Sequence, residues 1–435
     1  SQYLGMAADL AMAFPRAMDA WDRTAEHAMG QGEPALHEVV FPRPVFSEDE
    51  EKANSKRLTA TQWAQPAIGA TSLATLGILE QLGLEPRWVG GHSFGEVTAL
   101  HAAGVLGEEQ MLRVARKRGE LMAEAARVPG SMTAVVHPLD ELETLLSGWA
   151  VDGVVVANIN SPSQVVLSGT TPGIEAVEKL LEEEGIMATR LPVATAFHSP
   201  VVSPSREPFL AYLGEIPFAP PRIPVYANSE AAPYPADEAA MREILAGQIA
   251  KPVRFVEQVM AMYQAGARVF VEVGPGSVLT GLVGKCLRGS AHMAVNTDRK
   301  GQDGVSALFN AMGKLAVAGL PLELMQLWAP HDEVDDPRLR KRPPLAVQID
   351  GVNFGKKYPP EGGAAALPPP NPPRVAPVEP RVAPASASTP PAGGVAKMTA
   401  PPAPALPPPG AAADWVQAYR EIQQQTAAIH DTYQH

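Results

Sequence analysis

The stretch Gly91-His92-Ser93-Phe94-Gly95 is the most informative motif of this 435-residue chain. It follows a short apolar segment at residues 87–90 and precedes a helical run, so it matches G-x-S-x-G, the pattern of a serine on a sharp strand-to-helix turn. The glycines allow such a turn. The following helix N-terminus would bring the Phe94 main-chain amide and the positive end of the dipole to a developing oxyanion. The motif therefore predicts Ser93 as a nucleophile on a strand-to-helix turn.

Apolar spacing on both sides of this turn predicts helices. Residues 65–82 are apolar nearly all round, as in a buried helix, and residues 108–126 repeat apolar side chains at helical spacing. Residues 6–18 are amphipathic. Residues 41–58 are charged and irregular, and they are predicted to form a loop.

The texture changes between residues 129 and 193, where short β-branched runs alternate with two helical stretches. The order strand–helix–strand–strand–helix–strand is that of a ferredoxin-like subdomain. Two more apolar runs, residues 223–228 and 267–274, resemble buried strands. The sequence thus predicts a large α/β-hydrolase-like body, residues 1–128 and 194–320, interrupted by a ferredoxin-like α+β insertion at residues 129–193.

The C-terminal part is different in composition. Residues 321–360 are polar and interrupted by prolines, and they are predicted to be a linker region. Eighteen of the 45 prolines lie between residues 359 and 410, so residues 361–410 are expected to be an extended, disordered tether. Residues 411–435 repeat apolar side chains at spacings of 3 and 4, which predicts an amphipathic helix. It is either part of a following domain or a docking helix.

Charge and composition exclude several functional classes. The net charge of −12 argues against a nucleic-acid or anionic-membrane partner, and no apolar run approaches the roughly 20 residues that span a bilayer. The first residues lack the pattern of a signal peptide. Cys286 is the only cysteine, which fits a reducing compartment, so a cytoplasmic location is expected.

A nucleophilic serine needs a base, and His198 in the stretch VATAFHSP is the best of the ten histidines. His92 is adjacent to Ser93, but neighbours on a turn point in different directions, so a structural role is expected for it. No spacing of His, Cys, Asp and Glu resembles a metal site, and no phosphate-binding loop is present. The sequence therefore predicts Ser93–His198 chemistry without a metal.

Five motifs then carry a resemblance to a known family. In order they are GHSFGE around Ser93, KRGELM around Arg118, NINSPSQVVLSG at residues 158–169, AFHS around His198 and VEVGPGSVLTGLV at residues 271–283. Together they resemble the malonyl-CoA:acyl carrier protein transacylase family, the acyltransferase domain of fatty acid and polyketide synthases, over residues 1–329. Residues 345–360, the tether and the final helix also resemble the corresponding part of polyunsaturated fatty acid synthases.

The resemblance implies a reaction in two halves. Ser93, with His198 as general base, takes the acyl group from a CoA thioester, and the phosphopantetheine thiol of an acyl carrier protein then removes it. No bound cofactor is implied. In this family a main-chain carbonyl orients the histidine, and by similarity it lies in the segment KPVRF near Arg254. The other domains of a parent synthase are implied partners.

The resemblance also implies a substrate. Arg118 matches the family arginine that binds the free carboxylate of malonyl-CoA, a role suited to a guanidinium. From the residues alone, a solvated helix face is favoured for it. Phe197 resembles the residue of malonyl-selecting members, where bulk excludes a 2-methyl branch. Gln65 and Met132 lie in segments that line the substrate pocket of the family, or they are simply core residues.

One departure and two alternatives accompany the resemblance. Ser1-Gln2 match only the last two residues of a Gly-Gln-Gly-Ser-Gln turn whose first glutamine supplies a second oxyanion amide. Without that donor the rate is expected to fall by about 10²–10³.

Two alternative functions remain open. The alternatives are a serine hydrolase of thioesterase or patatin-like type, for which Asp152-Gly153 is a weak match, and an inactive carrier-docking module. The site is expected between the two subdomains.

Overall fold

The computed structural model describes residues 2–27, 33–125, 128–149, 151–193, 195–329 and 361–363. Two compact units divide the chain, residues 1–341 and 342–435, and nearly all the described residues belong to the first. The predicted tether, the predicted C-terminal helix and most of the linker region at 321–360 lie outside the described residues. No described helix is long and apolar enough to cross a membrane.

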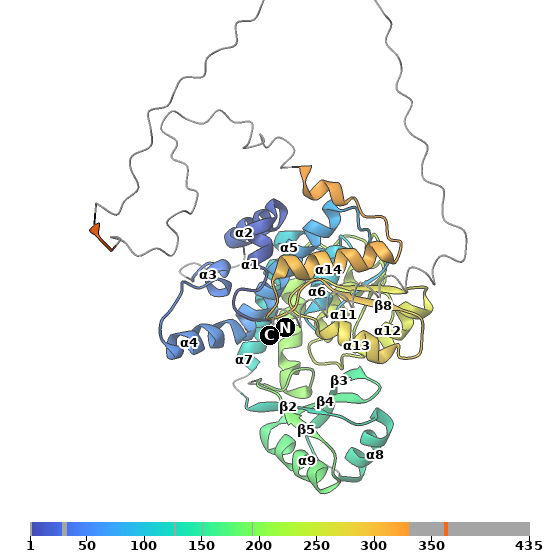
Figure 1. The fold of residues 1–435 in the computed structure, drawn as a ribbon. Coiled ribbons are helices and arrows are strands. Elements are labelled where there is room, and N and C mark those ends of the chain that lie inside the picture. Colours follow the sequence, from blue (N-terminus) through green and yellow to red (C-terminus); the bar gives the residue numbers. More distant parts are fainter. Residues whose placement is uncertain are drawn as a thin grey trace, which may run out of the picture. The chain divides into compact units, whose positions relative to one another are not determined.

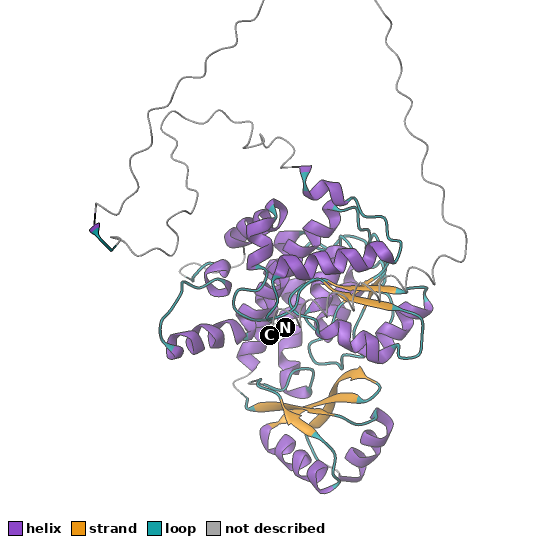
Figure 2. Ribbon diagram, in the orientation of Figure 1, coloured by secondary structure: helices purple, strands orange, loops and turns teal. Residues whose placement is uncertain are grey.

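Two short parallel strand pairs lie within the large body. β1 (Val89–Gly90) pairs with β6 (Val225–Tyr226), and β7 (Val269–Glu272) pairs with β8 (Met293–Asn296). β1 directly precedes the elbow motif, so the predicted strand at 87–90 is confirmed in a shorter form. Helices make up most of the body around these strands (Figure 2). The fold is mixed α/β, as predicted.

The helices of the body are numbered in chain order, and two 3₁₀ segments, η1 and η2, accompany them. They are α1 (Ala8–Ala13), α2 (Pro15–His27), α3 (Leu36–Val40), α4 (Glu48–Thr59), α5 (Thr61–Gln81), α6 (Gly95–Ala102), α7 (Glu108–Ala125), η1 (Pro200–Ser205), α10 (Arg206–Gly214), α11 (Glu238–Gly247), α12 (Phe255–Gln264), α13 (Val278–Cys286), α14 (Gly304–Val317) and η2 (Leu324–Leu327).

The pair α5 and α7 forms the centre of the main hydrophobic core. α5 is buried nearly all round, as its composition predicts. The two helices pack backbone to backbone at Gly119, where a Cβ atom would lie only 2.6 Å from Cα of Gln62. This close approach occurs one residue after Arg118 and brings its helix face against α5.

Two predictions in the N-terminal part were wrong in detail. The predicted loop at 41–58 contains helix α4, because Ser47 caps its N-terminus by accepting from the Glu50 N–H, and acids fill its first turn while bases fill its last. Such a helix needs little apolar surface, so periodicity did not reveal it. The predicted helix at 6–18 is two helices, because Phe14 adopts an extended conformation between α1 and α2.

A separate four-stranded antiparallel sheet occupies the middle of the sequence. Its strands are β2 (Gly130–Val135), β3 (Val154–Ser161), β4 (Gln164–Thr170) and β5 (Ala188–Arg190), in spatial order β3-β4-β2-β5. Helices α8 (Leu139–Trp149) and α9 (Thr171–Glu183) cover one face (Figure 1). The opposite face carries a small apolar cluster of Met132, Ala157 and Val166. The predicted strand and helix order is therefore observed.

The chain begins and ends this sheet unit at neighbouring points. β2 starts at Gly130, where a Cβ atom would lie 2.6 Å from the main-chain N of Ala196. Leu191, just after β5, donates its N–H to the Met132 carbonyl at 2.9 Å. The unit also contacts the body through β3, since the Ile159 N–H donates to the Val253 carbonyl at 2.9 Å.

Candidate active site

The elbow between β1 and α6 places Ser93 in a strained conformation. Its φ is 53°, in the left-handed region that non-glycine residues rarely adopt. Such strain typically costs on the order of 1–3 kcal/mol and persists only where surrounding contacts impose it. Gly91 is required here, because a Cβ atom would lie 1.9 Å from the carbonyl carbon of Gly95. Gly95 itself has open space at its Cβ position, so only the first motif glycine is sterically required.

His198 lies directly against the serine. Its Nε2 is 2.7 Å from Ser93 Oγ, and its Nδ1 lies 3.0 Å from the Gln248 carbonyl and 3.1 Å from the Lys251 carbonyl. Carbonyl oxygens only accept, so Nδ1 must carry the proton and Nε2 must present its lone pair to the serine hydroxyl. His198 also has a positive φ of 55°. The structure thus brings together the predicted pair in the tautomer that a general base needs.

The predicted segment KPVRF supplies one of the two orienting carbonyls, but at Lys251 and not at Arg254. Arg254 donates its main-chain N–H to the Asn228 carbonyl at 3.0 Å, and its side chain pairs with Glu257. The carbonyls on His198 belong to Gln248, before the segment KPVRF, and Lys251, its first residue. The turn after α11 brings both carbonyls to His198 Nδ1. The sequence does not show which main-chain carbonyl of such a turn points at the histidine.

Burial sets the protonation state of His198. The side chain is 3% exposed. Desolvation, followed by the positive charge of Arg118, lowers its pKa from 6.5 to about 3. The imidazole is therefore neutral at pH 7, which is the form that accepts a proton.

The guanidinium of Arg118 lies on the other side of the serine. It is 1% exposed, not on the solvated face that the residues alone favour, and its Nη2 is 3.4 Å from Ser93 Oγ. Nη1 donates to Gln65 Oε1 and Nη2 to Gln248 Oε1, each at 2.8 Å. In the described part of the chain Nε has no acceptor, and no carboxylate forms an ion pair with this arginine. Burial lowers its pKa to about 10, so it stays charged at pH 7.

A neighbouring arginine on the same helix shows what Arg118 lacks. Arg116 forms ion pairs with Glu33 at 2.7 Å and Glu120 at 2.6 Å. Among the described residues Arg118 hydrogen-bonds only to neutral oxygens, and Glu96, the buried carboxylate that acts on its charge, forms no ion pair with it. A bound anion would therefore give this buried guanidinium the direct charged partner that it lacks.

Two glutamines hold this arginine, and the sequence predicted only one of them. Gln65, from α5, is 5% exposed and donates through Nε2 to Thr61 Oγ1 at 2.7 Å. Gln248, at the end of α11, was missed. Its side chain accepts from Arg118 and donates to the Ser93 carbonyl at 2.8 Å, while its main chain accepts from His198. The only sequence signal for Gln248 was its helical spacing from the apolar residues Met241 and Leu245 of α11, which are buried.

The remaining predicted residues lie on the apolar side of the site. Phe197 precedes His198 and packs against both the main core and the cluster of Met132, Ala157 and Val166. Met132 therefore lies on the face of the four-stranded sheet that is opposite helices α8 and α9, and it faces the loop that carries His198.

The predicted oxyanion donor is the main-chain amide of Phe94. The Phe94 amide lies at the start of α6 and, in the described part of the chain, donates to no acceptor.

His92 connects the elbow to the four-stranded sheet. Its ring nitrogen Nε2 is 2.8 Å from Asn160 Oδ1 on β3, and its ring packs against Phe255 with centroids 5.4 Å apart. Burial lowers its pKa. These contacts suit the structural role predicted for it. Among the described residues, no cluster of three or more His, Cys, Asp and Glu side chains is arranged to hold a metal ion.

A buried acidic network beneath the elbow was not predicted. Glu96 is fully buried and accepts from the Asn228 N–H at 2.8 Å and from the Tyr234 hydroxyl. Desolvation raises its pKa from 4.5 to about 7. Glu96 follows the serine by three residues in GHSFGE, so the motif contained a signal that its side chain lies under the turn.

Comparison with known proteins agrees with this geometry. A model of the acyl transferase domain matches residues 1–321. The chain is 30% identical over 355 residues to a polyunsaturated fatty acid synthase polypeptide of Thraustochytrium sp., covering 79% of this chain but 12% of that protein. It is 34% identical over 301 residues to malonyl CoA-acyl carrier protein transacylase of Bacillus subtilis, covering 68% of this chain and 90% of that one.

A solved structure shows the same fold. The acyltransferase domain from the second module of the salinomycin polyketide synthase superposes with a TM-score of 0.67 at 30% identity, covering 77% of this chain and 76% of that one. The chain thus spans most of a single-domain relative and about an eighth of a multidomain one. Because the family model covers most of its length and the serine, histidine and arginine lie together, the chain belongs to the acyl transferase domain family.

Proposed function

We propose that this chain transfers a malonyl group from CoA to the phosphopantetheine thiol of an acyl carrier protein, through an ester on Ser93. The observation that carries the proposal is Arg118. Its Nε–H is free, its Nη2 lies 3.4 Å from Ser93 Oγ, and its hydrogen-bond partners among the described residues are all neutral oxygens. A malonyl thioester has a carboxylate two bonds beyond its reacting carbonyl, which suits this arrangement.

The first half-reaction forms the ester. Ser93 Oγ attacks the thioester carbonyl as its proton passes to His198 Nε2, 2.7 Å away. The Phe94 amide stabilises the oxyanion. The C–S bond then breaks, and the imidazolium returns the proton to the departing CoA sulfur. The Gln248 and Lys251 carbonyls stabilise the imidazolium in place of the carboxylate of a Ser-His-Asp triad.

The second half-reaction reverses the roles. The phosphopantetheine thiol gives its proton to Nε2 of His198, and its sulfur attacks the ester carbonyl. The bond to Ser93 Oγ breaks, and the serine takes the proton back. Throughout both halves Arg118 holds the distal carboxylate, so the acyl group needs no further anchor.

The Bacillus relative supports the carrier partner by its name, and the Thraustochytrium relative supports a parent synthase with other domains. The site requires no bound cofactor for this chemistry. We further infer that residues 129–193 form a ferredoxin-like subdomain, since their strand order β3-β4-β2-β5 and helix order fit that fold, inserted in an α/β-hydrolase-like body at 1–128 and 194–320. The cytoplasmic location stays a prediction.

A thioesterase-like hydrolase is the alternative. A hydrolase would share the elbow and the histidine, but its reaction does not require a buried arginine beside the nucleophile to bind a carboxylate. Asp152, the candidate for a patatin-like dyad, is exposed in the turn before β3, and the partners of Ser93 and His198 among the described residues do not include it. The geometry therefore favours transfer.

Intact-protein mass spectrometry tests the proposal. The protein is mixed briefly with equal malonyl-, methylmalonyl- and acetyl-CoA, with and without a phosphopantetheinylated carrier protein. We expect one malonyl adduct, absent in Ser93→Ala, that moves to the carrier when it is added. Free malonate accumulating without carrier labelling would indicate the hydrolase. Equal loading of all three acyl groups would contradict the malonyl assignment.

A further inference from the structure

The side chain of Asn228 makes four hydrogen bonds beneath the elbow. It lies two residues after the end of β6 and is fully buried. Oδ1 accepts from the Ser93 main-chain N–H at 2.6 Å and from Gln248 Nε2 at 3.2 Å. Nδ2 donates to the Gly91 carbonyl at 2.5 Å and to Gln258 Oε1 at 3.1 Å. Because the Ser93 N–H only donates and the Gly91 carbonyl only accepts, the partners fix which end of the amide is which.

Two of these bonds span the turn that carries the nucleophile. The Gly91 carbonyl and the Ser93 N–H lie on either side of His92, and a single amide group holds both. Ser93 needs such support, since its φ of 53° is unfavourable for a residue with a side chain. The amide acts as a two-point clamp on the elbow backbone.

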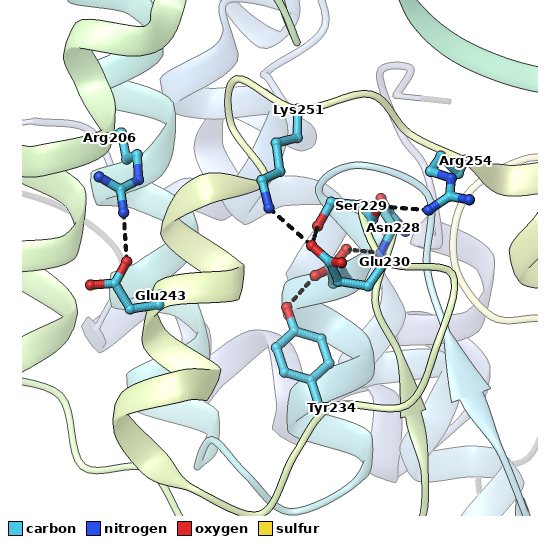
Figure 3. Close-up of polar contacts among 9 residues, drawn as sticks. Arg206, Asn228, Ser229, Glu230, Tyr234, Glu243, Lys251 and Arg254 are labelled. Carbon is cyan, nitrogen blue, oxygen red and sulfur yellow. Dashed lines mark hydrogen bonds and ion pairs between the residues drawn. The ribbon is translucent and has the colours of Figure 1, made fainter.

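Asn228 is itself held firmly. Its N–H donates to the Glu96 carboxylate at 2.8 Å, and the Tyr234 hydroxyl donates to the same carboxylate. Figure 3 shows the Tyr234 hydroxyl pointing toward the segment that carries Asn228 and Ser229. Arg254 lies beside this segment and donates to the Ser229 carbonyl. β6 pairs with β1 in parallel, Gly90 opposite Tyr226, so the strand that ends at the elbow and the strand that ends near Asn228 share one register.

We propose that Asn228 is a positioning residue that holds Ser93 in its reactive backbone conformation. It acts through the main chain of the elbow rather than on the substrate. Its bond to Gln248 ties the elbow to the residue that also contacts His198 and Arg118. The inference rests on the proposed function only in taking Ser93 as the nucleophile.

The test compares Asn228→Ala with Gln258→Ala. Gln258 is a matched control, because it is also buried and bonds Asn228 and the Tyr226 carbonyl but makes no hydrogen bond to Gly91 or Ser93. Two rates are measured, Ser93 labelling by a fluorophosphonate and acylation by malonyl-CoA. The melting temperature is recorded for each variant. The fluorophosphonate carries neither CoA nor a carboxylate, so it reports on the nucleophile alone.

For Asn228→Ala we expect both rates to fall by about 10²-fold, the effect of misplacing a reacting atom by about 1 Å. The malonyl-CoA concentration for half-maximal acylation should stay unchanged, since Arg118 and Gln65 are untouched. Gln258→Ala should change either rate only a few-fold at a similar loss of melting temperature. Asn228→Asp keeps the acceptor for the Ser93 N–H and should label at an intermediate rate, which covers the case that the alanine variant does not fold.

Rates that fall equally in the alanine variants at Asn228 and Gln258, in step with melting temperature, would overturn the proposal, as would wild-type labelling of Asn228→Asp. A shift in half-maximal malonyl-CoA concentration alone would also overturn it. If wild-type protein is labelled by the fluorophosphonate but not by malonyl-CoA, the proposed function fails while the labelling comparison still decides the role of Asn228.

Discussion

The large body and the four-stranded sheet contribute different kinds of side chain around Ser93. The body supplies His198, Arg118 and the amides that hold them, joined by hydrogen bonds. The sheet supplies an apolar cluster of Met132, Ala157 and Val166. Phe197 contacts both. This contrast predicts that substitutions among the polar residues change the rate of acylation, whereas substitutions on the apolar cluster change which acyl groups are accepted.

The largest expected effect is on the polar side. His198→Ala should slow acylation by malonyl-CoA by about 10³-fold, since general bases contribute about 10²–10⁴. Single-turnover mass spectrometry measures the rate. His92→Ala serves as the control, because His92 bonds Asn160 and not the serine hydroxyl, and it should lose less than about tenfold. An equal loss in both variants would remove the assignment of the base.

Next comes Arg118→Ala, which separates binding of the carboxylate from the chemistry. Malonyl loading should fall by about 10²-fold, while acetyl loading should change only a few-fold, since a charged bidentate contact is lost only with malonyl. Competition between the two CoA esters measures the ratio. Arg116→Ala, on the same helix but paired with Glu33 and Glu120, should leave the ratio unchanged. Equal loss of both substrates would rule out the carboxylate role.

The apolar side should respond more weakly. Phe197→Ala or Met132→Ala should raise the ratio of methylmalonyl to malonyl loading by about tenfold, because one methyl group in a tight apolar site is worth that order of discrimination. Malonyl loading itself should fall little. A variant that loses all loading, with the ratio unchanged, would mean that the sheet supports the catalytic residues instead of limiting acyl size.

The smallest change is expected with pH. The pKa of His198 is lowered to about 3, so the base form persists as pH falls, and acylation should vary by less than about twofold from pH 8 to pH 5. An ordinary histidine would lose about 30-fold over the same range. Glu96, whose pKa is raised to about 7, gains a proton there, so Glu96→Gln is the control. A midpoint near 6.5 in both proteins would contradict the depressed pKa.

The sequence showed the chemistry-bearing residues better than the residues that hold them. The elbow, α5 and α7 could be predicted because each has a strong local pattern. Arg118 lies at helical spacing from the buried Met111, Ala115 and Met122, but its basic neighbours favoured a solvated face, so only the family resemblance indicated its place in the site. Helix α4 was missed because capping and charge, rather than periodicity, stabilise it.

The supporting polar residues had no comparable signal. The contacts of Gln248 and Asn228 join elements that are far apart in the sequence. The sequence does not distinguish such a buried amide side chain from an exposed one. The orienting carbonyl was placed near Arg254 for the same reason, since main-chain groups leave no trace in the sequence. Long-range polar contacts are thus what the sequence alone could not predict.

The neighbouring ends of the four-stranded sheet unit have a practical consequence. The backbone at Gly130, where the sheet unit begins, lies against the backbone at Ala196, just after the unit ends, so the two connections to the body are adjacent. A homologous segment of different length can therefore be exchanged between these points without stretching the chain that carries the nucleophile or the base. Exchange of this unit alone would then test whether its apolar cluster sets the acyl preference of the site.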